Sequence, residues 1–145
     1  MLEVPNTFTM IVPDGWSATR NDGTYELTKP GDDGAAHVSV YDRSGDALGD
    51  DEAERVLATF ISRTGVGEPP PIRVLRESNS QHRAVATFTT DWDGQAFSWL
   101  AFVVLWRERM LICSCNASPG STMLGEAEQM FASIFKPKRK LFGRK

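Results

Sequence analysis

Residues 95–106 constrain the fold most strongly, because they are apolar on both faces of a predicted strand. Side chains at alternate positions of a strand point to opposite faces of its sheet. One face carries Phe97, Trp99, Ala101, Val103 and Leu105, and the other carries Ala96, Leu100, Phe102, Val104 and Trp106. Such a strand must be covered on both sides. We therefore expect it to lie within a sheet that has a layer of structure on each face.

The segments on either side of this strand predict an antiparallel meander. Residues 84–90 precede it across the turn Asp91–Gly94, and residues 110–117 follow it after a three-residue connection. Connections this short join neighbouring antiparallel strands. Further strands are predicted over residues 7–12, 24–28, 37–41 and 72–77, separated by turns rich in Asp, Gly and Pro. The expected sheet is antiparallel and has six or seven strands.

Two segments show the apolar period of an α-helix. The first carries Ala53, Val56, Leu57, Phe60, Ile61 and Thr64 on one stripe. We expect Asp51 and Glu54 to cap its N-terminus, and Gly65 to end it in a left-handed conformation. The second is expected to begin at Ser118 and Pro119. Its apolar face carries Met123, Leu124, Ala127, Met130, Phe131 and Ile134. The predicted class is α+β, an α/β/α sandwich with one helix on each face of the sheet.

The charge distribution separates a body from a tail. The chain has 145 residues and a net charge of −3, from 16 Lys and Arg and 19 Asp and Glu. The last ten residues hold Lys136, Lys138, Arg139, Lys140, Arg144 and Lys145 and no acid, which leaves ten basic and 19 acidic residues, or −9, in residues 1–135. We expect one domain over 1–135 and a basic, flexible tail over 136–145. An acidic body argues against specific nucleic-acid binding.

Neither a secretory signal nor a membrane span is expected from the sequence. The N-terminal residues lack a basic start and an apolar run, and the longest apolar run, residues 99–106, is too short to cross a bilayer. A cytoplasmic protein is therefore expected. Cys113 and Cys115 lie two apart on one predicted strand, a spacing poorly suited to a disulfide between them. We expect both to be reduced core thiols.

The order of the predicted elements resembles that of the PsbP-like fold group. The resemblance rests on a strand followed by Pro13–Trp16, a hairpin rich in Asp and Gly, an amphipathic helix, a three-stranded meander, and a final helix ending in Phe-Ala-Ser-Ile-Phe at 131–135. It covers residues 8–135. The group includes the photosystem II extrinsic protein, the Ran guanine-nucleotide release factor, and bacterial DcrB-like and LpqN-like proteins. The resemblance implies binding to proteins or complexes, and it brings no catalytic residues.

No catalytic, cofactor or metal motif withstands inspection. His37 falls in a predicted strand and His82 in a predicted turn, and neither shows a spacing that places it beside a nucleophile. Cys113 and Cys115 could offer two thiolates to a metal, but a closed zinc site needs four ligands. The glycine spacing of 120–125 lacks the Lys and Ser or Thr of a phosphate loop. The acidic residues at 32–33 and 50–52 lack the ligand spacing of a calcium loop.

Aromatic and basic residues are the remaining candidates for binding. Trp99 and Trp106 fall on opposite faces of the predicted strand 95–106, so they are expected to lie in the core under different helices. Trp16 is expected to cap the core. Trp92, at a hairpin tip, either anchors a partner or folds back over the sheet edge. The tail, 136–145, is solvated, docks on an acidic protein, or touches an anionic surface.

Three hypotheses of function follow. The first is a non-enzymatic module that holds a protein partner at a sheet edge, a hairpin tip or a helix-flanked groove, with adaptors, secretion-associated chaperones and toxin-immunity proteins as specialisations. The second is a carrier of a small molecule or lipid in an apolar pocket between sheet and helix. The third, a hydrolase using His37 or His82, is remote. No enzymatic activity, cofactor or metal is therefore expected.

Overall fold

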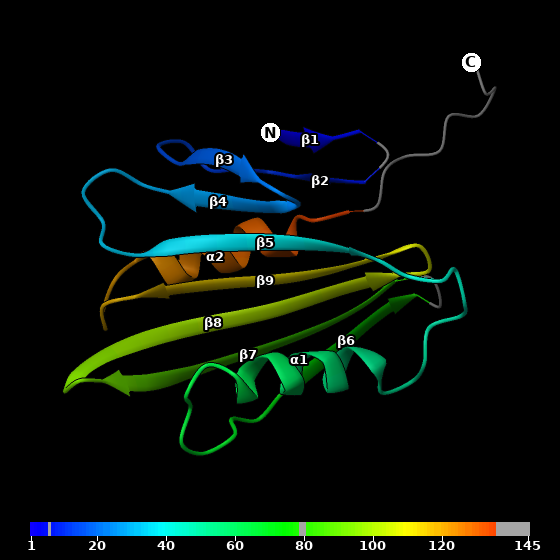
Figure 1. Cartoon of the computed structure of the whole chain (residues 1–145). Coiled ribbons are helices and arrows are strands. Elements are labelled where there is room, and N and C mark those ends of the chain that lie inside the picture. Colours follow the sequence, from blue (N-terminus) through cyan, green and yellow to red (C-terminus); the bar gives the residue numbers. More distant parts are fainter. Residues whose placement is uncertain (6, 79–80, 136–145) are drawn as a thin grey trace.

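The described residues fold into a main antiparallel sheet with a helix on each face and a small second sheet of two strands (Figure 1). The computed structural model describes residues 1–5, 7–78 and 81–135. In chain order the elements are β1 (Leu2–Val4), β2 (Phe8–Met10), β3 (Ser17–Asn21), β4 (Thr24–Thr28), β5 (Ala35–Asp42), α1 (Glu52–Ser62), β6 (Arg73–Ser78), β7 (Gln81–Trp92), β8 (Gln95–Trp106), β9 (Arg109–Ala117) and α2 (Met123–Ala132). The predicted α+β class with one helix on each face is confirmed.

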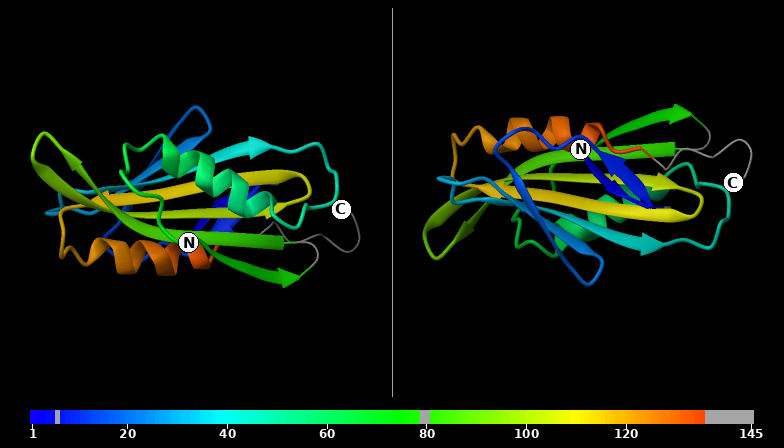
Figure 2. Two further views of the ribbon diagram at one scale, coloured as in Figure 1. Left: turned by 90° about the horizontal axis from the view of Figure 1, so that it is seen from below. Right: turned by 90° about the horizontal axis from the view of Figure 1, so that it is seen from above.

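The main sheet has seven strands in the order β3-β4-β5-β9-β8-β7-β6, and every neighbouring pair is antiparallel. β8 lies inside the sheet, between β7 and β9, as its two apolar faces predict. Residues 95–97 of β8 pair only with β7, because the pairing of β8 with β9 begins at Ser98. The β7–β8 hairpin therefore reaches beyond the rest of the sheet at one end (Figure 2).

The two faces of β8 belong to two separate cores. Leu100, Phe102, Val104 and Trp106 pack in the larger core under α2, together with β1 and β2. Ala101, Val103 and Leu105 pack against Ala53, Leu57 and Ile61 of α1 in the smaller one. Small residues such as Ala84, Ala86 and Ala101 line that smaller core, which brings α1 close to β7 and β8. The period-2 pattern of one strand thus organises both layers.

A buried arginine joins the sheet to the end of α2. Arg83 on β7 is 1% exposed. Its Nη1 donates to the carbonyl oxygens of Ala132 (2.8 Å) and Phe131 (3.3 Å), and its Nη2 donates to that of Ile134 (2.6 Å). The last carbonyls of a helix have no partner within the helix, and these bonds give that end of α2 a donor from the sheet.

The start of the chain differs from the prediction. Residues 8–10 form β2, which pairs with β1 in a separate two-stranded sheet instead of joining the main one. The place beside β4 is taken by β3, whose five side chains are all exposed. Because no side chain of β3 is buried, the segment has no apolar alternation from which a strand could have been predicted. Trp16 caps the α2 core as expected, at 8% exposure.

Both helix starts also differ from the prediction. Asp51 precedes α1 but makes no capping bond, and Glu52, not Glu54, reaches back to accept a hydrogen bond from the Gly49 amide (3.2 Å). α2 begins at Met123, not at Ser118, because Gly120 adopts a left-handed conformation that interrupts the helix. Gly65 has φ of +86° after α1, as predicted.

Candidate functional site

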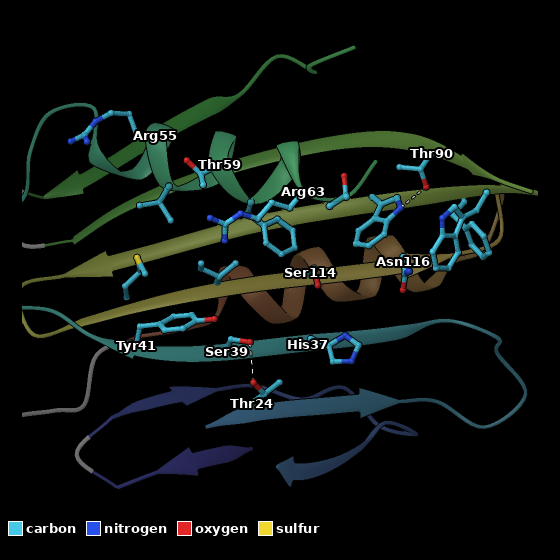
Figure 3. A pocket seen from close by; sticks show the side chains of 18 residues that line it. Thr24, His37, Ser39, Tyr41, Arg55, Thr59, Arg63, Thr90, Ser114 and Asn116 are labelled. Atoms are coloured by element: carbon cyan, nitrogen blue, oxygen red, sulfur yellow. Dashed lines mark hydrogen bonds between the residues drawn. The ribbon is translucent and has the colours of Figure 1, made fainter. Parts of the chain in front are cut away.

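A groove of about 1160 Å³ lies between α1 and the part of the sheet that α1 leaves uncovered (Figure 3). α1 packs chiefly across β6, β7 and β8. The same face of β9, β5 and β4 therefore stays open beside it. The groove is lined by Thr24, His37, Ser39, Tyr41, Arg55, Val56, Thr59, Phe60, Arg63, Thr64, Thr90, Trp92, Phe97, Trp99, Met110, Ile112, Ser114 and Asn116.

The floor of the groove is formed by the faces of β9 and β5 that point away from α2. In β9, Leu111, Cys113 and Cys115 are buried under α2, while the alternating positions Met110, Ile112, Ser114 and Asn116 line the groove. β5 contributes Tyr41, Ser39 and His37 in the same way. Along the groove, the floor changes from apolar at Met110, Ile112 and Tyr41 to polar at Ser114, Asn116 and His37 (Figure 3).

One side of α1 forms the wall. Leu57 and Ile61 point into the core, and the next stripe around the helix presents Val56, Phe60 and Arg63 to the groove. This arrangement follows from the helical period, which places residues three and four apart on one face. The wall combines an apolar base at Phe60 with a cationic rim at Arg55 and Arg63.

Aromatic residues of the projecting β7–β8 hairpin close one end of the groove. Trp99 stacks on Phe88 with ring centroids 5.7 Å apart and planes at 7°, and its indole Nε1 donates to Thr90 Oγ1 (2.9 Å). Trp99 is therefore half-buried on the α1 side instead of lying under the helix. Trp92 at the hairpin tip is 77% exposed and does not fold back over the sheet edge. It lies at the rim of the groove.

The charge of the groove is opposite to that of the chain as a whole. No carboxylate is among the described residues that line it, whereas Arg55 and Arg63 are. Asp51 Oδ1 lies 3.2 Å from Arg55 Nε, in a pair exposed to solvent. Within the described ranges Arg63 makes no ion pair. Since exposed ion pairs contribute little, both guanidinium groups are available to an anionic ligand.

Arg43 fixes the position of α1, which forms the wall of the groove. Arg43, after β5, donates to both carboxylate oxygens of Glu52 at 2.8 Å, and its Nη1 also donates to the carbonyl of Arg107 at 2.8 Å. Partial burial alone would raise the pKa of Glu52, but the bonds from Arg43 and the Gly49 amide outweigh that effect and lower it. The bonds tie the first turn of α1 to the β8–β9 turn.

One polar row across the strands has the composition of a hydrolytic triad but not its geometry. Glu26, His37 and Ser114 are directly paired across β4, β5 and β9. His37 Nε2 lies 3.2 Å from Glu26 Oε2, but no hydrogen bond joins His37 to Ser114 in the described part of the chain. The surrounding amides belong to paired strands, and acyl transfer needs free donors for its oxyanion. His82, predicted in a turn, is instead a buried residue of β7.

Other sequence candidates lie away from the groove. Cys113 and Cys115 are unpaired thiols in the α2 core, where burial raises the pKa of Cys115 to about 12 and that of Cys113 further. The described residues contain no cluster of three potential metal ligands. Among those same residues, no helix has the length and hydropathy that a membrane crossing requires. The basic residues of 136–145 lie outside the described residues.

Comparisons with known proteins show similarity of fold. No protein-family model and no curated protein matches the sequence. A protein from Bacteroides thetaiotaomicron VPI-5482 matches 91% of this chain with a TM-score of 0.63 and 17% identity, and the chain spans 46% of that protein's length. LpqN from Mycobacterium tuberculosis, described as involved in cell envelope biogenesis, matches 92% of this chain and 87% of its own, with a TM-score of 0.55 and 13% identity.

Proposed function

We propose that the protein is a non-enzymatic interaction module that holds a segment of a protein partner in the groove between α1 and the open face of β9, β5 and β4. The observation that carries this proposal is the half-covered sheet face itself. It combines an apolar floor at Met110 and Ile112, an aromatic end at Trp99, and an exposed Trp92 at the rim. Aromatic residues and arginines are the side chains that interfaces enrich.

The dimensions of the groove favour a protein segment over a metabolite. Small-molecule sites usually enclose about 300–1000 Å³, and this groove, at about 1160 Å³, is larger and open along one side. A compact ligand would leave much of the apolar floor exposed to water, whereas a segment of a protein partner can cover its whole length. The resemblance of the predicted element order to the PsbP-like group, which implies binding to proteins or complexes, also favours this proposal, and the fold is similar to that of LpqN. An adaptor, a secretion-associated chaperone or a toxin-immunity protein, acting in the cytoplasm, would fit this proposal.

The second candidate is a carrier of a small molecule or lipid. Its specific support is that the apolar lining lies between sheet and helix, as a carrier pocket would. Native mass spectrometry of protein purified without detergent separates the two candidates. A stoichiometric apolar ligand that survives purification favours the carrier, and a ligand-free chain favours the interaction module.

Site-specific photocrosslinking in the native cell tests the proposal. A benzophenone amino acid replaces Tyr41, an exposed aromatic residue in the groove, and in a matched control it replaces Ile11, an exposed apolar residue on β2's side of the fold. We expect a discrete protein adduct from position 41 that position 11 does not give. Equal adducts from both positions, or none from position 41, would refute the proposal.

A further inference from the structure

We infer that the segment bound in the groove is an amphipathic α-helix of about four turns that places carboxylates beside Arg63. This inference rests on the proposed function and adds the conformation and the charge of the occupant. Such a helix would lie beside α1 and complete the layer that α1 covers only in part. Figure 3 shows the open strip of β9 and β5 next to α1.

Backbone hydrogen bonding excludes an extended strand as the occupant of the floor. A peptide that joins a sheet as a strand needs a free edge, where N–H and C=O groups are unpaired. The floor lies in the interior of the sheet, because β9 pairs with both β5 and β8, and β5 pairs with both β4 and β9. A helix satisfies its own backbone groups and needs from the floor only side-chain contacts.

The size of the open strip matches one helix. Three neighbouring strands at about 4.8 Å spacing span about 10 Å from the first to the last, and an α-helix with its side chains is about 10–12 Å across. Along β9, the lining runs from Met110 to Asn116. Six steps of about 3.4 Å give about 20 Å, which corresponds to about 14 residues of helix at 1.5 Å each.

The polarity of the lining determines which helix fits. Met110 and Ile112 on the floor and Phe60 on the wall form a continuous apolar surface, so the occupant needs an apolar stripe. Ser114 and Asn116 extend the floor as polar groups toward the hairpin. One end of the bound helix is therefore expected to be more polar than the other.

The charge of the wall selects an acidic flank. Arg63 is exposed, extends over the groove from the C-terminal end of α1, and makes no ion pair among the described residues. Arg55 lies on the same side of α1, about two turns closer to its N-terminus. No described lining residue is acidic, although residues 1–135 of the chain carry nine more acidic than basic side chains. Glu or Asp on the flank that faces α1 would be complemented, and Lys or Arg there would be repelled.

The test uses a display library of 30-residue segments tiled across the proteome of the source organism. Segments are selected on the full-length chain and then measured on Arg63→Glu and on Arg20→Glu. Arg20 is a matched control, because it is exposed and its guanidinium lies over the ring of Tyr25, which belongs to the core on the α2 side. The basic tail is identical in all three proteins, so its attraction for acidic segments cancels.

We expect the enriched segments to be amphipathic and acidic and to become helical by circular dichroism on binding. Arg63→Glu should weaken their binding about tenfold or more, and Arg20→Glu should change it less than about twofold. Enrichment of basic or extended segments, equal effects of the two substitutions, or no enrichment would overturn the inference. If position 41 still crosslinks a protein in the cell, these negative results refute the acidic helix and leave the proposed interaction module standing.

Discussion

Replacing Arg43 with Met is expected to release the groove wall. The guanidinium makes two hydrogen bonds of 2.8 Å to Glu52 in a pair whose side chains are only 10% and 21% exposed. Charge-assisted bonds of this kind contribute about 1.5–3 kcal/mol when they are shielded from water. The carbonyls of Asp46 and Arg107 that Arg43 also binds are exposed, so water replaces that contact at little cost. We expect a total loss of about 2–3 kcal/mol, or about 5–10 °C in the unfolding midpoint.

Urea denaturation of Arg43→Met, Glu52→Gln and the double variant measures this loss and its origin. We expect a coupling energy of about 1–2 kcal/mol between the two side chains. Hydrogen exchange should show faster exchange in the first turns of α1 without a matching change in β8. Arg109→Met is the control, because its partner Asp42 is 87% exposed, and such a pair is expected to contribute less than about 1 kcal/mol. A coupling energy near zero, or unchanged exchange in α1, would refute the reasoning that Arg43 fixes the wall.

Three further predictions concern stability and reactivity. Arg83→Met should destabilise the fold by about 3–5 kcal/mol in urea, because a guanidinium that is 1% exposed and bonded to three carbonyls at the end of α2 is lost; a loss below about 1 kcal/mol would contradict that role. The pKa of Glu52 is lower in the folded than in the unfolded chain, so the stability it contributes is complete above its ordinary pKa of 4.5 and is lost as pH falls through the folded-state value. Arg43→Met should flatten this acid dependence, and an unchanged profile would assign it to other groups. Cys113 and Cys115 should resist a thiol reagent at pH 8 until the chain unfolds, as both are buried with raised pKa values; rapid labelling of the native protein would contradict their burial.

The parts of the fold that follow from local pattern could be predicted from the sequence. The two apolar faces of residues 95–106 correctly placed a helix on each side of the sheet. The apolar stripes of both helices and the left-handed Gly65 were also correct. The sequence left open whether Trp92 at the hairpin tip is exposed or folds back, and the structure shows it exposed. Each of these features depends on the chemistry of a few consecutive residues. β3 was missed because all its side chains are exposed, so its sequence has no alternation of apolar and polar residues that would indicate a strand.

The sequence led to the hypothesis of a groove or pocket beside a helix, but not to its position or its lining residues. Both depend on which strands α1 packs across, and a local pattern does not determine that. One signal was present. In β9, the buried face carries Leu111, Cys113 and Cys115, while the other face turns polar at Ser114 and Asn116. A central strand with one partly polar face indicates that its cover is incomplete. The sequence indicated Trp92, which lies at the rim, as a candidate for partner binding. It gave no indication that Arg63 and His37 line the same groove.

The role of the groove is tested most directly by the affinity of the crosslinked partner for a chain whose groove is filled. Ser114→Tyr places a ring in the middle of the floor, and Thr19→Tyr places the same ring on the exposed strand β3 as a control. We predict that Ser114→Tyr weakens binding by about tenfold or more, while both variants keep a native-like unfolding midpoint and Thr19→Tyr binds as the unaltered chain does. Equal affinity of the two variants for the partner would contradict the assignment of the groove as the binding site.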